Sequence, residues 1–237
     1  MTGRDWHAYW NQRTVDPDID TSAALRQVGK TVLGNPIEAG QLQILADHIA
    51  DTLSLEPSDN AVDLGCGNGL LTSLLAPYVR SVLALDYSVP LIEVARRHFP
   101  RKTIRYEVAD LRNIGCRDFS LTEFNKAWCC EVLQHLSSDE ALGMLRELLA
   151  GLPAGGLVLA CGIPDQAKLR SFYNSPERWA LYERNLYLGQ EQIGHWWHRD
   201  ELMEIVGKAG GRMRFVEPPE TFYTSHYRFD VLIERQP

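Results

Sequence analysis

Apolar and polar residues follow one another along this chain in the order expected of alternating strands and helices. Short apolar runs lie near residues 61–64, 82–86, 104–111, 127–136 and 157–160. Stretches with helical spacing separate several of them, at 70–79, 91–99 and 139–149. Strand signals that alternate with helix signals predict a mainly parallel sheet covered by helices.

Both ends of the chain depart from this alternation. Residues 1–56 have a helical pattern, and one apolar face of it contains Leu42, Leu45, Ala46, Ile49 and Leu53. Near the other end, residues 200–206 read as a helix, and residues 212–216 and 227–234 read as two strands. Residues 163–197 contain seven Phe, Tyr and Trp residues and two prolines, and we interpret them as an insertion.

A glycine-rich loop follows the first apolar run, in the order Asp63-Leu64-Gly65-Cys66-Gly67-Asn68-Gly69. Glycines permit positive φ angles and let a ligand approach the bare backbone. The helix that begins near Gly69 would direct its free N–H groups at such a ligand. A dinucleotide loop has the spacing G-x-G-x-x-G, whereas the third glycine here comes one residue earlier. The carboxylate of Asp63 suits a ligand with a positive amino group better than a pyrophosphate.

Further acidic residues end the second and third predicted strands. Asp86 lies 17 residues after Gly69, close to the offset of about 20 residues at which a carboxylate holds ribose hydroxyls in nucleotide-binding folds. Asp110 ends the third strand. The carboxyl ends of strands one, two and four form one edge of such a sheet, so we expect a cleft there.

These motifs, in this order and spacing, resemble those of the class I S-adenosylmethionine-dependent methyltransferases of the small-molecule type. The resemblance implies an α/β, Rossmann-like, mostly parallel seven-stranded sheet with an antiparallel C-terminal hairpin. A single domain over residues 1–237 would then carry a helical N-terminal flap (residues 1–56) and an inserted helical lid (residues 163–197).

The resemblance also implies a cofactor, S-adenosyl-L-methionine, and the residues that bind it. Asp86 would hold the ribose, Asp110 the adenine amino group, and the backbone of Leu111 the adenine ring. Related enzymes close an aromatic N-terminal helix over the cofactor, which indicates Tyr9 and Trp10. Lys30 suits the cofactor carboxylate by charge, although a surface position is the simpler interpretation. The full set of predicted cofactor contacts is Tyr9, Lys30, Asp63, Gly65, Cys66, Gly67, Asp86, Tyr87, Asp110, Leu111 and Cys130.

The methyl acceptor is expected beneath the lid insertion. Tyr173, Tyr182 and Trp196 are predicted to face it, with a plain aromatic core as the alternative. His135 follows the fourth strand and is predicted to act as a general base or to orient the acceptor. A structural hydrogen bond is the other interpretation. His48 and His98 are expected on helices away from the cleft and exposed to water, and His195, His198 and His226 are weaker candidates.

Composition narrows the function classes. A net charge of −7 gives no general attraction for nucleic acid, and no apolar run approaches a membrane span. The first residues have no signal-peptide core, and five cysteines have no disulfide-like spacing, so we expect a cytoplasmic protein. A monomer or a homodimer fits this description.

The segment Glu131-x-x-x-His135 resembles the E-x-x-E-H of ubiquinone-pathway O-methyltransferases, but Gln134 replaces the second acid, and we predict no metal. The favoured function is methyl transfer to a hydroxyl or carboxyl oxygen of a small molecule. The alternatives are an N-methyltransferase that acts on a protein or an amine, and a nicotinamide-dependent oxidoreductase.

Overall fold

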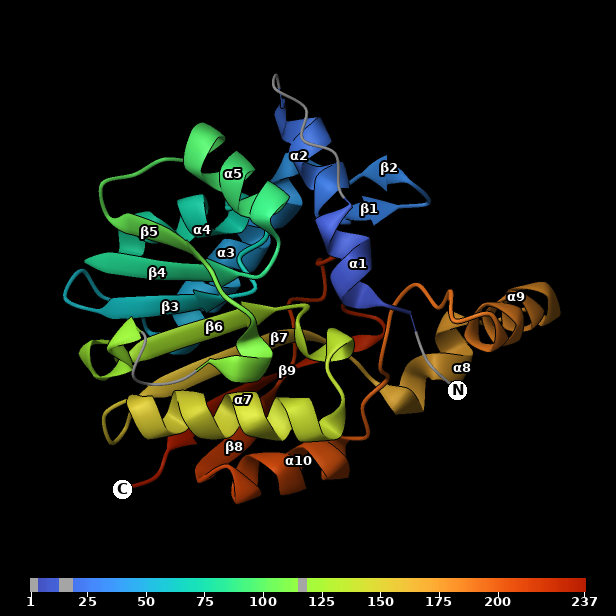
Figure 1. Cartoon of the computed structure of the whole chain (residues 1–237). Helices are drawn as coiled ribbons and strands as arrows, with labels where there is room; N and C mark the ends of the chain where they lie inside the picture. The colour runs from blue at the N-terminus through green and yellow to red at the C-terminus, as the bar shows by residue number, and fades with distance from the viewer. Residues whose placement is uncertain (1–3, 13–18, 115–118) are drawn as a thin grey trace.

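A seven-stranded sheet forms the centre of the molecule (Figure 1) in a computed structural model that describes residues 4–12, 19–114 and 119–237. Its strand order is β5-β4-β3-β6-β7-β9-β8. The strands are β3 (Asn60–Leu64), β4 (Ser81–Asp86), β5 (Ile104–Val108), β6 (Lys126–Cys130), β7 (Leu157–Pro164), β8 (Gly211–Val216) and β9 (Arg228–Arg235). β3 to β7 pair in parallel, whereas β9 is antiparallel to both β7 and β8. The predicted parallel sheet with an antiparallel C-terminal hairpin is therefore confirmed.

Helices cover both faces of this sheet (Figure 1). One face packs against α3 (Ala39–Leu53), α4 (Leu70–Leu75) and α5 (Val89–His98), and the other against α7 (Ser138–Gly151) and α10 (Arg199–Lys208). The apolar face predicted for the helix that is now α3 is buried: Leu45, Ile49 and Leu53 are at most 3% exposed. Burial of these two helix layers on a sheet produces two apolar cores, one on each face.

Side-chain caps fix where two of these helices begin, next to the strand ends that matter for the site. Ser88 caps α5 two residues after β4 and accepts a hydrogen bond from the Leu91 N–H. Ser137 and Glu140 form a capping box at the start of α7, in which each side chain accepts from the backbone N–H of the other residue. Each cap satisfies N–H groups that the helix itself leaves free.

The N-terminal segment contains α1 (Trp6–Asn11) and α2 (Thr21–Gln27), and also a short hairpin that its helical pattern did not predict. β1 (Thr31–Val32) pairs with β2 (Asn35–Pro36). The turn residues Leu33 and Gly34 have φ angles of 50° and 80°, as a tight hairpin turn of this twist requires. Strands of two residues are too short to show an alternating pattern of apolar and polar residues in the sequence.

The insertion at 163–197 contains α8 (Leu169–Phe172) and α9 (Pro176–Tyr187), which extend from the sheet on the side of α1 (Figure 1). Five single-turn 3-10 helices complete the described elements: Ala76–Tyr78, Leu111–Asn113, Leu121–Glu123, Leu133–His135 and Gln166–Lys168. Within the described residues, no helix is long and apolar enough to cross a membrane.

Candidate active site

A large cavity lies where the sheet changes direction. After β3 the chain adds β4 and β5 on one side and then places β6 on the other side of β3. Loops that leave neighbouring strands in opposite directions open a crevice at the strand ends. The cavity there has a volume of about 1190 Å³. Pockets for one small molecule measure roughly 300–1,000 Å³, so this cavity has room for a cofactor and a second molecule.

The glycine loop forms one wall of this cavity. Gly67 and Gly69 have φ angles of 55° and 79°. A Cβ on Gly67 would lie 3.0 Å from a methyl group of Val28, and one on Gly69 would lie 2.7 Å from the hydroxyl of Tyr106. Both positions therefore favour glycine, one because φ is positive and Val28 packs closely against it, and the other because α4 begins against β5.

Two buried carboxylates lie beside the loop. Asp86 accepts hydrogen bonds from the N–H groups of Gly67 (2.8 Å) and Ser88 (2.9 Å), one on each oxygen. Each carboxylate oxygen has a second lone pair, so Asp86 can still accept ribose hydroxyls. Asp63 accepts from the Thr72 hydroxyl at 2.7 Å. Burial raises the pKa of Asp63 to about 7 and that of Asp86 to about 6.

The third acid, Asp110, lies at the outer end of the same wall. Its carboxylate pairs with the Arg112 guanidinium at 2.5 Å, and this hydrogen bond lowers the pKa of Asp110. Next to it, the Tyr87 ring stacks on His7, with ring centres 4.9 Å apart. The Tyr87 hydroxyl donates to the carbonyl of Trp6 at 2.7 Å, so the end of β4 holds α1 in place.

The helix α1 covers the cavity and touches the insertion on its far side. The Arg4 guanidinium, just ahead of α1, donates to the carbonyls of Gln190 and Glu191, both at 2.8 Å. It also lies over the rings of Trp6 and Tyr9, at 5.4 and 4.7 Å. The N-terminal segment and the insertion therefore meet above the cavity.

The floor of the cavity contains a buried ion cluster. The Lys30 ammonium lies 2.6 Å from one oxygen of Glu131, and the Arg228 guanidinium lies 3.9 Å from the other. Burial alone would raise the pKa of Glu131, but the two cations lower it to about 2. Glu131 has a φ of 56°, a strained backbone angle for a residue other than glycine. Such strain is concentrated at functional sites.

His135 lies between the flap and this cluster. Its ring is 4.3 Å from that of Trp6 and 5.8 Å from that of Trp10, centre to centre. Burial and the nearby charge of Arg228 lower the pKa of His135 to about 3, so the ring is neutral at neutral pH. Its Nδ1 has no hydrogen-bond partner among the residues that the structure describes. A neutral imidazole with a free ring nitrogen can accept or donate one hydrogen bond.

Most of the predicted site residues come together here. All eleven predicted cofactor contacts line the cavity: Tyr9, Lys30, Asp63, Gly65, Cys66, Gly67, Asp86, Tyr87, Asp110, Leu111 and Cys130. His135 and Tyr173 line it too. Tyr182 and Trp196 do not. They pack behind Tyr173, with ring centres 4.6 and 6.1 Å from its ring. Their positions therefore favour support of Tyr173 over direct contact with an acceptor.

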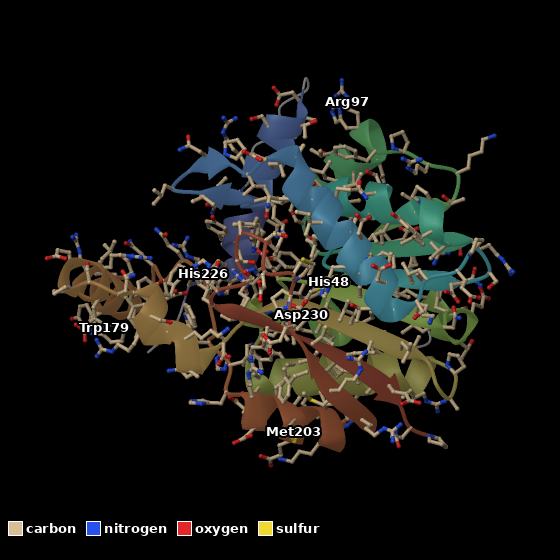
Figure 2. The ribbon with its side chains drawn as sticks, turned by 180° about the vertical axis from the view of Figure 1, so that it is seen from behind. His48, Arg97, Trp179, Met203, His226 and Asp230 are labelled. Carbon is tan, nitrogen blue, oxygen red and sulfur yellow. The ribbon has the colours of Figure 1, made fainter. Side chains whose placement is uncertain are left out.

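Two other expectations about side chains are corrected by the structure. Lys30 is only 7% exposed and forms an ion pair, so the interpretation as a surface lysine is wrong. His48 is not exposed to water: its Nε2 lies 2.7 Å from the carboxylate of Asp230, and the two residues lie next to each other in Figure 2. The helix α3 packs on β7, which brings His48 to the C-terminal hairpin.

Several lining residues were missed by the sequence analysis. The ion pairs of Glu131 were not predicted, and Tyr223, Tyr227 and Arg228 were not considered as lining residues. An arginine at the first position of an apolar strand is a weak signal of a binding site. Its position beneath the cavity depends on the antiparallel return of β9 beside β7, which pairs Arg228 with Pro164.

Comparisons with known proteins identify methyltransferases among the proteins to which this chain is similar. Residues 61–156 match the family described as "Methyltransferase domain". A ubiquinone biosynthesis O-methyltransferase of Xanthomonas campestris pv. campestris is 29% identical over 112 residues, which cover 46% of this chain and 45% of that protein. A carboxy-S-adenosyl-L-methionine synthase of Vibrio atlanticus is 29% identical over 113 residues, 44% of this chain and 45% of that protein. The chain thus matches less than half the length of these relatives.

Solved structures share the fold over most of the chain. An S-adenosylmethionine-dependent methyltransferase from Clostridium acetobutylicum has a TM-score of 0.64 at 14% identity and covers 89% of this chain and 97% of its own. Magnesium protoporphyrin IX methyltransferase from Synechocystis, with bound SAH, has a TM-score of 0.59 at 16% identity, over 98% of this chain and 94% of its own. The predicted class, the class I methyltransferase fold, is confirmed.

Proposed function

We propose that this protein transfers a methyl group from S-adenosyl-L-methionine to a small molecule. The observation that carries the proposal is one cavity that is lined by the glycine loop, by three acids at strand ends and by the ion cluster of Lys30, Glu131 and Arg228. The backbone of Gly65 and Gly67 lines the cavity, and Asp63 and Asp86 offer carboxylates to an ammonium and to ribose hydroxyls. The match to a methyltransferase domain supports methyl transfer over the nicotinamide-dependent alternative.

The residues of this chain bind the cofactor, orient the acceptor and exclude water from the cavity. The cofactor brings an already activated methyl group on its sulfonium, so in-line positioning supplies much of the rate. Trp6, Tyr9 and Trp10 cover the cavity and keep water away from it. His135, neutral and with an unused ring nitrogen, is placed to hydrogen-bond an acceptor hydroxyl. We infer an oxygen acceptor on this basis, and an amine acceptor is the alternative outcome of the assay.

The function is tested first by cofactor binding. The Asp86→Ala variant is expected to bind S-adenosylhomocysteine about 1–3 kcal/mol more weakly, because it loses hydrogen bonds to a charged acceptor. Calorimetry measures this loss, and transfer of a labelled methyl group to a panel of phenols, acids and amines measures turnover. Glu93→Ala, which removes an equal charge from the exposed side of α5, serves as the control. Absence of binding by the unmodified protein would rule out the proposed function.

Cofactor affinity is expected to depend on pH. The ionised carboxylates of Asp63 and Asp86 accept donors, and burial raises the pKa of these groups to about 7 and about 6. Ionisation is therefore lost as the pH falls through these values, and affinity falls with it. From Asp86 alone, affinity at about pH 5 should be about tenfold lower than at about pH 8. Titrations with S-adenosylhomocysteine across this range check the sign, and Asp86→Asn should leave only the part of the pH dependence that comes from Asp63.

The proposed flap is tested by truncation. Removal of residues 1–16 deletes α1 and with it the proposed contacts of Tyr9 and Trp10 to the cofactor, so affinity for S-adenosylhomocysteine should fall about tenfold, the worth of one or two hydrogen bonds to the ligand. The sheet should remain folded, because none of its strands lies in that segment. Circular dichroism reports the fold in the same samples. Unchanged affinity and turnover in the truncated protein would exclude a flap.

A further inference from the structure

The floor of the cavity has more positive than negative charge. Lys30, Glu131 and Arg228 all line it, which places two cations around one carboxylate. The carboxylate is shared unequally, since Lys30 lies at 2.6 Å and Arg228 at 3.9 Å. Arg228 is only 4% exposed. A buried charge with an incomplete ion pair is costly, and it is stabilised by an anion that completes the pair.

The hydrogen bonds of Arg228 leave part of its guanidinium unused. Its Nη1 donates to the side-chain oxygen of Gln134 and to the carbonyl of Gly162, both neutral acceptors. Its Nε has no hydrogen-bond partner among the residues that the structure describes. A guanidinium is the side chain best suited to bind a carboxylate through two parallel hydrogen bonds.

The nearby acid Asp230 does not neutralise this cation. One of its oxygens accepts from the Gly162 N–H at 2.7 Å, and the other faces His48 at 2.7 Å. Figure 2 shows Asp230 beside His48, near α3. Glu131 is therefore the carboxylate in an ion pair with Arg228 within the described part of the chain.

Aromatic and apolar side chains also line this cavity. The rings of Phe172, Tyr173, Tyr223 and Tyr227 line it around the cluster. At its outer rim, Leu33 and Leu181 also line the cavity and are 98% and 53% exposed. Exposed apolar side chains at the mouth of a pocket favour a ligand with an apolar body.

We propose that the methyl acceptor is an aromatic or apolar acid whose carboxylate binds to Arg228 on the cavity floor. The proposal rests on the proposed function and specifies its substrate class. The carboxylate serves as the binding group, with Arg228 as the residue that determines specificity. Glu131 competes with the acceptor for the same guanidinium and sets how tightly an anion binds.

Binding of a simple pair of probes tests this proposal. With S-adenosylhomocysteine present, calorimetry should show 2-naphthoate binding at least about tenfold more tightly than 2-naphthamide, which has the same shape and no charge. Arg228→Gln should remove this preference. Glu131→Gln, which removes the competing carboxylate, should strengthen naphthoate binding and leave naphthamide unchanged. Arg212→Gln, an equal loss of charge at a side chain that is 71% exposed, should change neither.

The results of these experiments distinguish a failure of the acid-binding proposal from a failure of the proposed methyltransferase function. Binding of S-adenosylhomocysteine without any preference for naphthoate would overturn the acid-binding site and leave the methyltransferase proposal standing. Failure to bind S-adenosylhomocysteine would overturn the function instead. If Arg228→Gln does not fold, the opposite effect of Glu131→Gln still decides the matter, because weaker or unchanged naphthoate binding in that variant contradicts the proposal.

Discussion

Replacing Gly69 with alanine is expected to destabilise the fold by about 2–5 kcal/mol and to abolish cofactor binding. A left-handed backbone angle costs a residue with a Cβ roughly 1–2 kcal/mol, and overpacking adds roughly 1–3 kcal/mol. Here φ is 79°, and the new Cβ would lie 2.7 Å from the Tyr106 hydroxyl and 2.9 Å from the Ala95 Cβ. Urea unfolding and binding of S-adenosylhomocysteine measure the two effects.

Gly143→Ala is the matched control for this substitution. Gly143 lies within α7, and a Cβ there meets no atom within 4 Å. Alanine is a better helix former than glycine, so this variant should gain up to about 1 kcal/mol. Opposite changes in the free energy of unfolding would show that the geometry of the glycine loop causes the effect at Gly69, and that replacement of a glycine does not by itself destabilise the protein. A tolerated Gly69→Ala would contradict the close packing described here.

Replacing His135 with alanine is expected to lower turnover about 10²-fold while cofactor affinity stays within about twofold. A misplaced acceptor costs about this factor. The adenosine-binding acids proposed here lie on β4 and after β5, away from His135. Because its pKa is about 3, the imidazole is a weak proton acceptor at neutral pH, and we expect orientation to be its main contribution. Single-turnover rates with saturating acceptor measure the effect.

The glutamine variant separates the two roles of His135. Glutamine offers a hydrogen bond without a titratable ring, so His135→Gln should recover most of the lost rate if the residue orients the acceptor. A drop of 10²–10⁴-fold in both variants would instead indicate a general base. Its pKa would then appear as a limb in the pH dependence of kcat. A drop below about tenfold in both variants would mean that positioning by other groups suffices.

The cofactor side of the site was predictable from the sequence because its residues depend on local order. Asp63 is the next-to-last residue of β3, Asp86 ends β4 and Asp110 follows β5, and parallel strands bring such positions to one edge. The loop between β3 and α4 was identified by its three glycines. Burial then modifies what the sequence predicts: the carboxylates of Asp63 and Asp86 lie in an apolar surrounding that raises their pKa values.

The floor and the lid side were not predictable to the same degree. Lys30, Glu131 and Arg228 are about one hundred residues apart from one to the next, and only the tertiary fold brings them together. The aromatic residues of the insertion give no local signal for which ring faces inward. Tyr173 lines the cavity and Tyr182 supports it from behind, although both belong to the same aromatic-rich segment.

The residues that line the cavity come from two parts of the chain. Asp63, Asp86 and Asp110 belong to residues 61–156, the segment that matches the methyltransferase domain. Lys30, Tyr173 and Arg228 lie outside it, before or after. Under the proposed function, the acids that hold the donor therefore lie within this segment, and Arg228, the proposed binding group for the acceptor, lies outside it. A change of acceptor can then arise from substitutions beyond the matched segment, and the match to the domain says nothing about the acid-binding site at Arg228.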